Sequence, residues 1–503
     1  MNNTIHKNSQ NLIKHFLIGR GNTMDKIKFS ILLEYLIKNS SYTIKRLAEE
    51  TNIDRTVLQK YISGTRFPNS YTNIEKIADK LTLPKEQRDS LYNSYKIEKV
   101  GYHKYERLQL IKEIIENINY PKEISDYDFN ILYSFNQINN FAFNNTDLIA
   151  LIRFMLYQAK KSKSHKLKAY LPIKNEIYDI ICNNLKSTTP LFMEMLIHIS
   201  TAKSEQLNNI KQFKNLLPII FLENTQIKYY YDNQAFIQNN TFSYPYLICC
   251  DQYSLLINSN LTSGILLENE INDYLSHQFD KIYSQAELFC KNISSPSDII
   301  NYYLEDSFIF QDSENNYSFS YEPCIVPALD QELIKKIYPG DNKNKEYVEN
   351  FLNSDHKHIL NHIKKGKNFF FYFTKSGLQS FYDTGKVSEI PNQFLNPFSK
   401  TDVIRILNRT INIANSYPTF RFYLIKEEKF NLPNKFSLTF NDIKNINITL
   451  GGKNEDSSVN LIILEPTLRN EFYSLIDLIT LEECCYDFEY SYEYLKKFIK
   501  KHK

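Results

Sequence analysis

The apolar residues of the first hundred positions recur at the spacing of amphipathic helices. From Phe29 to Tyr102 they fall at intervals of three and four residues, and short polar turns separate the runs. This periodicity predicts an all-α domain over residues 24–98. Residues 1–23 lack the pattern and are expected to form a flexible arm, with Met24 as an alternative start to Met1.

The helical periodicity continues to residue 215, so residues 99–215 are predicted to form a helical segment. The expected helices there are Tyr105–Ile118, Asp126–Phe135, Asp147–Lys160, Ile173–Leu185 and Leu191–Ser200. Near Leu216 the pattern changes to short β-rich runs, which predict strands. A polar stretch, Gln311–Tyr317, then marks the boundary between an α/β sensor-like domain, residues 216–310, and an α+β C-terminal domain, residues 311–503.

The strands expected after residue 216 are short and alternate with helical stretches. They include Pro218–Leu222, Ile227–Tyr231, Tyr246–Cys250, Ser254–Asn258, Phe369–Phe373, Thr419–Ile425, Ser437–Phe440, Asn445–Leu450 and Asn460–Glu465. At 503 residues the chain is too long for one core. The predicted fold is therefore multidomain: an all-α five-helix domain, then a helical segment and a mixed α+β body. No sequence repeat of 20–50 residues indicates a solenoid.

Charge is spread unevenly along the chain. Residues 1–100 hold 17 Lys and Arg against 10 Asp and Glu, a net charge of +7, although the whole chain carries only +3. The remaining 403 residues are therefore slightly acidic, at −4. A basic N-terminal domain on an acidic body is typical of attraction to phosphates confined to that domain.

Several classes of protein are disfavoured by composition. The chain has 11 glycines and no phosphate-binding glycine-rich motif, so no nucleotide cofactor, and no other cofactor, is expected. Seven cysteines without C-x-x-C spacing indicate reduced thiols and a cytoplasmic location rather than a disulfide scaffold or a zinc site. Because the longest apolar runs are far shorter than a membrane span, no membrane partner is expected.

One stretch, Thr43–Leu83, carries a specific pattern of caps, turn and core positions. Thr43 is expected to cap a helix over residues 44–51 by accepting the backbone N–H of Arg46. Asn52 then stands in the turn, where a positive φ is needed, and Asp54 caps a second helix over residues 55–62.

This stretch resembles the Cro and phage-repressor type of helix-turn-helix, the xenobiotic-response-element family. The residues that carry the resemblance are Leu47-Ala48-Glu49, Asn52-Ile53-Asp54, Ser63-Gly64-Thr65-Arg66, Pro68 and Ile77-Ala78-Asp79-Lys80-Leu81. With helices expected at Lys28–Asn39 and Lys85–Tyr95, it spans residues 26–96. Asn52 stands where the family more often has Gly, and Ile62 where it often has an acidic residue.

The resemblance implies that the second of these helices enters the major groove of double-stranded DNA with its N-terminal residues on the base edges. Carried over position by position, Arg55, Thr56, Gln59 and Lys60 would face the bases. The phosphates would be contacted by Thr43, Lys45, Thr65 and Arg66. A helical bundle for protein contacts, with Arg55 and Lys60 as solvated charges, is the alternative.

Three other groups of residues are weaker candidates for a functional site. Asp355, His358 and His362 have the helical spacing of zinc ligands, but neighbouring lysines favour a solvated helix face. The basic tract of residues 160–168 is read as an exposed loop, with a flanking DNA or anionic contact as the alternative. Cys249-Cys250 ends an apolar run, where thiols usually act as small core residues.

The function predicted is that of a sequence-specific transcription regulator, not an enzyme. Motifs of this family often act as dimers, so a homodimer is expected. The 400 residues after the DNA-binding segment are expected to sense an unidentified small-molecule or peptide effector. Two alternatives remain: a regulator whose body docks a peptide or protein, and an enzyme with a DNA-targeting head.

Overall fold

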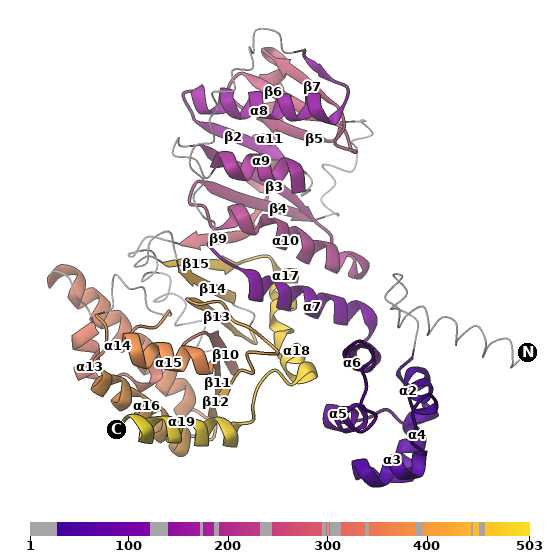
Figure 1. Cartoon of the computed structure of the whole chain (residues 1–503). Helices are drawn as coiled ribbons and strands as arrows, with labels where there is room; N and C mark the ends of the chain where they lie inside the picture. The colour runs from indigo at the N-terminus through magenta and orange to yellow at the C-terminus, as the bar shows by residue number, and fades with distance from the viewer. Residues whose placement is uncertain are drawn as a thin grey trace, which may run out of the picture. The chain divides into compact units, whose positions relative to one another are not determined.

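The computed structural model describes residues 28–120, 139–171, 175–185, 191–231, 244–293, 313–337, 342–388, 396–443, 446–451 and 458–503, with positions 298 and 301. The predicted arm, residues 1–23, lies outside these ranges. The chain divides into two compact units (Figure 1). One contains the described residues up to Gln109 together with Ile476–Cys484, and the other contains Leu110–Leu475 and Cys485–Lys503. The fold is therefore multidomain, with a helical N-terminal region and a mixed α/β body.

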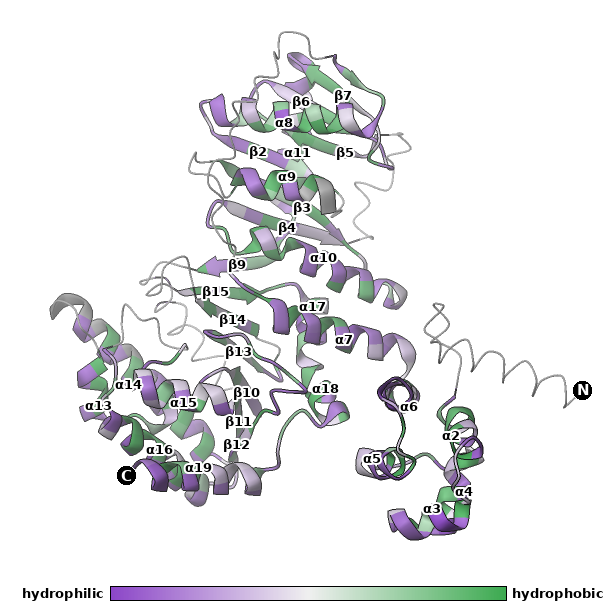
Figure 2. Ribbon diagram, viewed as in Figure 1, coloured by the Kyte–Doolittle hydropathy of each residue, from purple (hydrophilic) through white to green (hydrophobic). Residues whose placement is uncertain are grey.

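The first unit is helical throughout its described residues. Its helices are α2 (Phe29–Lys38), α3 (Ile44–Thr51), α4 (Arg55–Ile62), α5 (Tyr71–Lys80), α6 (Lys85–Val100), the first half of α7 (Tyr102–Asn117) and most of α18 (Leu475–Glu482). Figure 2 shows hydrophobic and hydrophilic residues alternating along α2 to α5. The hydrophobic positions meet in one core, in which Leu32, Leu47, Leu58, Ile74 and Leu91 are fully buried.

The first sheet of the second unit has eight strands in the order β1-β7-β6-β5-β2-β3-β4-β8. They are β1 (Phe141–Ala142), β2 (Lys166–Tyr170), β3 (Phe192–Ile199), β4 (Thr225–Tyr231), β5 (Tyr246–Cys249), β6 (Tyr253–Ile257), β7 (Gly264–Glu268) and β8 (Glu287–Leu288). The helices that belong to this sheet are α8 (Asn145–Lys161), α9 (Asn175–Leu185), α10 (Gln206–Ile220), after the short 3₁₀ turn Lys203–Glu205, and α11 (Glu270–Gln285). Helix α11 packs Phe279 and Tyr283 against Leu196 and Tyr230 of the strands.

The second sheet has seven strands in the order β12-β11-β10-β13-β14-β15-β9. They are β9 (Cys290–Ile293), β10 (Asn315–Ser320), β11 (Asn368–Phe373), β12 (Phe420–Leu424), β13 (Phe436–Asn441), β14 (Ile446–Gly451) and β15 (Ser458–Ile463). The associated helices are α13 (Gln331–Ile337), α14 (Asn342–Lys364), α15 (Lys375–Thr384), α16 (Lys400–Ser416), α17 (Pro466–Tyr473) and α19 (Phe488–His502), with a 3₁₀ turn at Val326–Ala328. Phe371 and Phe422 anchor the core between this sheet and its helices.

The two sheets share one topology. In each, three strands run parallel (β2, β3, β4 and β10, β11, β12), and the first of the three pairs antiparallel with the next strand along the chain (β5 and β13). A meander of antiparallel strands then continues away from the parallel set, through β6 and β7 or through β14 and β15. The body thus contains the same arrangement twice, without a short sequence repeat.

Most strands predicted after residue 216 are confirmed, but one strand predicted there and one helix predicted before it were wrong. Pro218–Leu222 does not form a strand, because α10 continues to Ile220 with Pro218 inside it. Leu191–Ser200, predicted as a helix, forms β3, in which Met193, Met195 and Ile197 are all buried. The predicted helical segment 99–215 therefore contains β2 and β3, and the predicted boundary at residue 216 falls inside the first sheet.

Candidate nucleic-acid interface

The turn between α3 and α4 is built by its local sequence as predicted. The hydroxyl of Thr43 accepts the backbone N–H of Arg46 at 3.2 Å, and the carboxylate of Asp54 accepts those of Thr56 and Val57 at 2.8 and 3.1 Å. Asn52 adopts the left-handed conformation, with φ 55° and ψ 38°. These contacts satisfy N–H groups that a helix start otherwise leaves open.

Helix α4 has two chemically distinct faces, as the sequence predicted. Leu58 and Tyr61 are buried in the core, and Val57 is half-buried against it. The opposite face is solvent-exposed and carries Arg55, Thr56, Gln59 and Lys60. Helix α4 therefore presents a polar, basic face whose position is fixed by the core behind it.

The four residues predicted to contact phosphates are exposed beside this face. Thr43 and Lys45 lie at the start of α3, and Thr65 and Arg66 lie in the loop that follows α4. The Thr65 hydroxyl lies 2.9 Å from that of Ser63, which holds the loop against the end of α4. Gly64 makes the turn possible, because its φ is +72° and a Cβ there would meet the Ser30 hydroxyl at 3.1 Å.

The cations of this surface differ from other basic side chains of the helical unit. Arg46 donates to Glu50 at 2.8 Å, and its hydrogen bond to that carboxylate raises the pKa of the guanidinium. Arg88 is bonded to Asp79. By contrast, four exposed cations form no ion pair with any residue in the described part of the chain: Lys45, Arg55, Lys60 and Arg66. Their charges are therefore available to an external anion.

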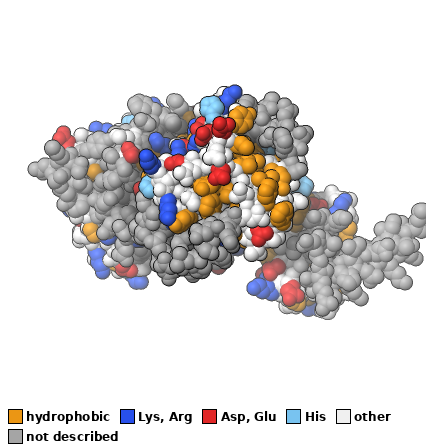
Figure 3. All heavy atoms as spheres, turned by 90° about the horizontal axis from the view of Figure 1, so that it is seen from above, with side chains coloured by type: hydrophobic (Ala, Val, Ile, Leu, Met, Phe, Trp, Pro, Cys, Tyr) orange, Lys and Arg blue, Asp and Glu red, His pale blue; other side chains and the backbone are white. Residues whose placement is uncertain are grey.

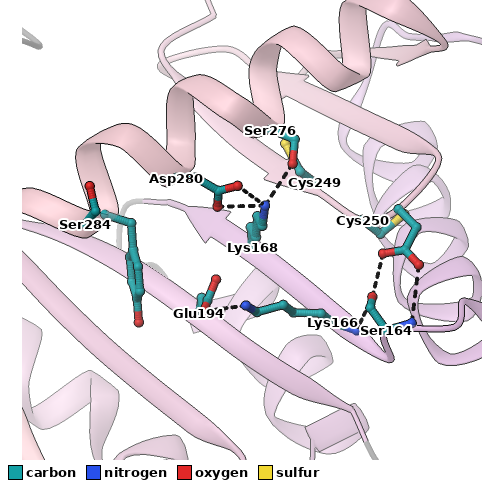
Figure 4. Close-up of a pocket in the computed structure, with 11 residues that line it drawn as sticks. Ser164, Lys166, Lys168, Glu194, Cys249, Cys250, Ser276, Asp280 and Ser284 are labelled. Atoms are coloured by element: carbon teal, nitrogen blue, oxygen red, sulfur yellow. Dashed lines mark hydrogen bonds and ion pairs between the residues drawn. The ribbon is translucent and has the colours of Figure 1, made fainter.

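A second candidate site is a polar cavity of about 440 Å³ on the face of the first sheet that α11 covers (Figure 4). Two ion pairs cross it. Lys166 Nζ lies 2.5 Å from Glu194, and Lys168 Nζ lies 2.7 Å from Asp280 and 2.9 Å from Ser276. The tract 160–168, predicted as a loop, thus ends α8 and begins β2, and places two of its lysines in this cavity.

The cavity is lined by thiols that are poor nucleophiles. Burial raises the pKa of the Cys249 thiol to about 12, and the Ser254 hydroxyl lies 3.1 Å from the sulfur. The thiol therefore stays protonated near neutral pH. This agrees with the interpretation of Cys249-Cys250 as core residues rather than reactive ones.

The histidine cluster on α14 is not the solvated face that the sequence predicted. His362 is only 2% exposed, and its Nε2 lies 2.9 Å from the amide nitrogen of Asn316 on β10. His358 lies near Ser354 instead. Among the described residues, no group of three His, Cys, Asp or Glu side chains has the arrangement of a metal site.

The described surface of the first sheet also exposes large apolar side chains. Phe141 and Phe143 at the edge strand β1, and Ile271 and Tyr274 at the start of α11, are 48–76% exposed. Figure 3 shows hydrophobic side chains gathered beside acidic ones on the face seen from above. No helix of the described residues is both long enough and apolar enough to cross a bilayer.

Comparison with known proteins assigns no family to the chain. No family model and no curated protein matches it. Among the solved structures that match the chain, three share 11% identity with it. TrmBL2, an archaeal chromatin protein whose structure shows a novel mode of DNA binding, has a TM-score of 0.20, with 55% of this chain and 98% of that chain covered.

The second is phosphatidylserine synthase from Haemophilus influenzae Rd KW20, with a TM-score of 0.24 and coverage of 79% of this chain and 98% of that chain. The third is polyphosphate kinase from Porphyromonas gingivalis, with a TM-score of 0.19 and coverage of 70% and 54%. At these TM-scores the similarities assign no function to this chain.

Proposed function

We propose that the chain is a sequence-specific DNA-binding transcription regulator, whose α3–α4 pair is a helix-turn-helix of the xenobiotic-response-element type. One observation carries the proposal: all eight residues predicted to contact DNA are exposed, and four of them are cations without an ion pair in the described chain. Such a surface matches the phosphate backbone of duplex DNA electrostatically.

In this proposal α4 lies in the major groove and its exposed face reads the bases. Arg55 is at the N-terminus of α4, where its guanidinium can donate two bonds to guanine O6 and N7. Gln59 and Lys60 lie one turn further along the same helix. Thr43 and Lys45 on one side and Thr65 and Arg66 on the other contact phosphates, which set the register of α4.

The proposal is tested with Arg55→Ala. Loss of a bidentate guanine contact should remove about 1–3 kcal/mol of discrimination between the selected site and scrambled DNA. Arg88→Ala is the matched control, because it removes the same charge from the same unit at a residue already bonded to Asp79. Selection of binding sites from random DNA, followed by affinity measurement, gives the readout. Equal sequence preference in wild type and Arg55→Ala would refute the recognition-helix assignment.

We further propose that the regulator binds DNA as a homodimer, since paired half-sites about one helical turn apart add affinity and specificity. The selected site should then be a palindrome, and light scattering should report two chains per DNA. A single, non-repeated half-site bound by one chain would contradict the dimer without affecting the assignment of α4.

The cavity under α11 is the proposed effector site. Its paired charges suit a small ligand that carries both a cationic and an anionic group, because such a ligand can exchange with the Lys166–Glu194 and Lys168–Asp280 pairs. Native mass spectrometry of protein purified from its host is expected to reveal a co-purifying small molecule. A bound peptide would instead favour a body that docks peptide or protein partners.

A further inference from the structure

Helix α18 is distant in sequence from the N-terminal helices but belongs to their compact unit. Its last residue, Glu482, is 386 positions from Lys96, yet the two side chains form an ion pair at 2.9 Å. The pair is almost completely enclosed, with side-chain exposures of 12% for Lys96 and 6% for Glu482. An enclosed pair of this kind is costly to break from one side, because the remaining charge has no partner.

The same carboxylate oxygen of Glu482 also accepts a hydrogen bond from Gln109 Nε2 at 2.9 Å. Lys96 lies on α6, and Gln109 lies on α7. Glu482 therefore joins two successive helices through one atom.

Gly101 is the joint between those two helices. Its φ is +85° and its ψ is 145°, and a Cβ at this position would have no neighbour within 4 Å. Glycine adopts this conformation at little cost, so the joint can bend where other residues would resist. The bridge through Glu482 spans the joint, because Lys96 precedes Gly101 and Gln109 follows it.

A contiguous set of contacts leads from this bridge toward α4. Tyr95, next to Lys96, stacks on Phe67 with ring centroids 4.9 Å apart. The Tyr95 hydroxyl also donates to the carbonyl of Pro68 at 3.3 Å. Phe67 directly follows Arg66, one of the residues proposed to hold a phosphate. Packing at α6 thus bears on the loop that ends the proposed DNA-binding surface.

The chain enters and leaves α18 through the two-sheet body. β15 and α17 precede α18, and α19 follows it. Helices α17 and α19 are the neighbours of α18 along the chain. A change in the second sheet that moves either of them is therefore expected to move α18 as well. Since α7 also continues into the body beyond Gln109, both ends of the bridge are tied to it.

We propose that Glu482 is a positioning residue that clamps the α6–α7 joint at Gly101, and that α18 is thereby the route by which the body adjusts DNA binding. The second half of this inference rests on the proposed function, whereas the clamp itself does not. The device is a two-position element: with α18 seated, Glu482 and the hydrogen bond from the Tyr105 hydroxyl to Asn93 both span the joint, and with α18 displaced only the Tyr105–Asn93 bond still spans it.

The clamp is tested by hydrogen–deuterium exchange of the full-length chain, which reports local opening of residues 97–109 without any DNA. Glu482→Gln removes the charge and leaves Lys96 enclosed without its counter-ion. Gln109→Leu removes only the hydrogen bond from α7 to Glu482 and leaves the Lys96–Glu482 ion pair intact. This variant is therefore expected to fold like the wild type. In both variants the backbone amides of residues 97–109 should exchange at least about tenfold faster than in the wild type.

Asp477→Asn is the matched control on the same helix. Asp477 pairs with Lys104 at 2.8 Å, but both side chains are largely exposed, at 52% and 42%, so this pair should matter little. Exchange in α2 to α5 should stay at the wild-type rate in all three variants. If Glu482→Gln and Gln109→Leu exchange no faster than Asp477→Asn, the clamp is refuted, whether or not the protein binds DNA.

The coupling is tested separately by DNA affinity. Glu482→Gln should change the dissociation constant for the selected site by about fivefold or more, although Glu482 is not a proposed DNA contact. Faster exchange with unchanged affinity would overturn the coupling and leave both the clamp and the proposed function standing. A wild-type chain that binds no duplex DNA would overturn the proposed function, while the exchange data would still decide the clamp.

Discussion

Asn52 shows how one residue sets the angle between the two helices of the candidate interface. Its backbone is left-handed, with φ 55°, a conformation that asparagine tolerates better than most residues and glycine adopts freely. In this turn the N–H of Ile53 donates to the carbonyl of Ala48 at 3.1 Å. The side chain of Ile53 is buried in the core. Position 52 therefore requires a residue that tolerates a positive φ, rather than one whose side chain makes a particular contact.

A β-branched residue at position 52 should therefore open the turn. We expect Asn52→Val to lower the free energy of local opening of α3 and α4 by about 1–2 kcal/mol, since a left-handed conformation is strained for valine. Asn52→Gly should change it by less than about 0.5 kcal/mol. Amide exchange of α3 and α4 in the full chain provides the measurement. Equal losses in both variants would indicate that the asparagine side chain, and not the backbone angle, matters.

At the scale of elements, α14 contacts the second sheet through a buried histidine, His362. Burial lowers the pKa of His362 from its ordinary value of 6.5, although the carbonyl of Asn368 opposes the shift. A histidine with a lowered pKa in the folded state binds a proton more readily when unfolded. The second sheet should thus be stable above pH 6.5 and lose stability as the pH falls below that value.

The variant His362→Gln should flatten this pH dependence, because it removes the titrating group while keeping a polar side chain near Asn316. His358→Gln is the control on the same helix, since His358 is only partly buried and contacts Ser354. Urea unfolding between pH 5 and 7.5, followed through the second sheet, measures the slope. If His358→Gln flattens the profile as much as His362→Gln, the assignment to His362 is wrong.

Elements that depend on local chemistry were predictable, and those that depend on distant contacts were not. The caps at Thr43 and Asp54 and the turn at Asn52 act over three residues, so the sequence pattern suffices for them. β3 was predicted as a helix because Phe192, Leu196 and Ile199 also stand at helical spacing, although the buried residues Met193, Met195 and Ile197 alternate as in a strand. Lys96 gives no sign in the sequence of a partner 386 positions away.

At the scale of the whole molecule, the concentration of positive charge in residues 1–100 predicts that DNA affinity depends on salt concentration. The proposed sites of counter-ion release from DNA are four cations that form no ion pair within the described residues, Lys45, Arg55, Lys60 and Arg66. The logarithm of the affinity should fall linearly with that of the salt concentration. Replacing Lys45 with Ala should reduce the slope by about 1 and leave sequence preference unchanged.

Titration of wild type and Lys45→Ala against salt, by fluorescence anisotropy, measures both slopes. Lys76→Ala serves as the control, because Lys76 is an exposed lysine on α5, outside the proposed surface. An affinity that does not depend on salt would point to a protein partner for the helical unit instead.

The doubled topology of the body has a consequence for how its two sheets can change in evolution. In a protein that obtains two such sheets by pairing identical chains, every substitution appears in both copies at once. Here the two sheets are encoded separately, so each can be altered alone. The first has Lys168 and Asp280 in an open polar cavity, whereas the second stacks Phe319 on Tyr372 in a closed aromatic layer. One sheet can therefore change toward ligand binding while the other keeps its aromatic packing.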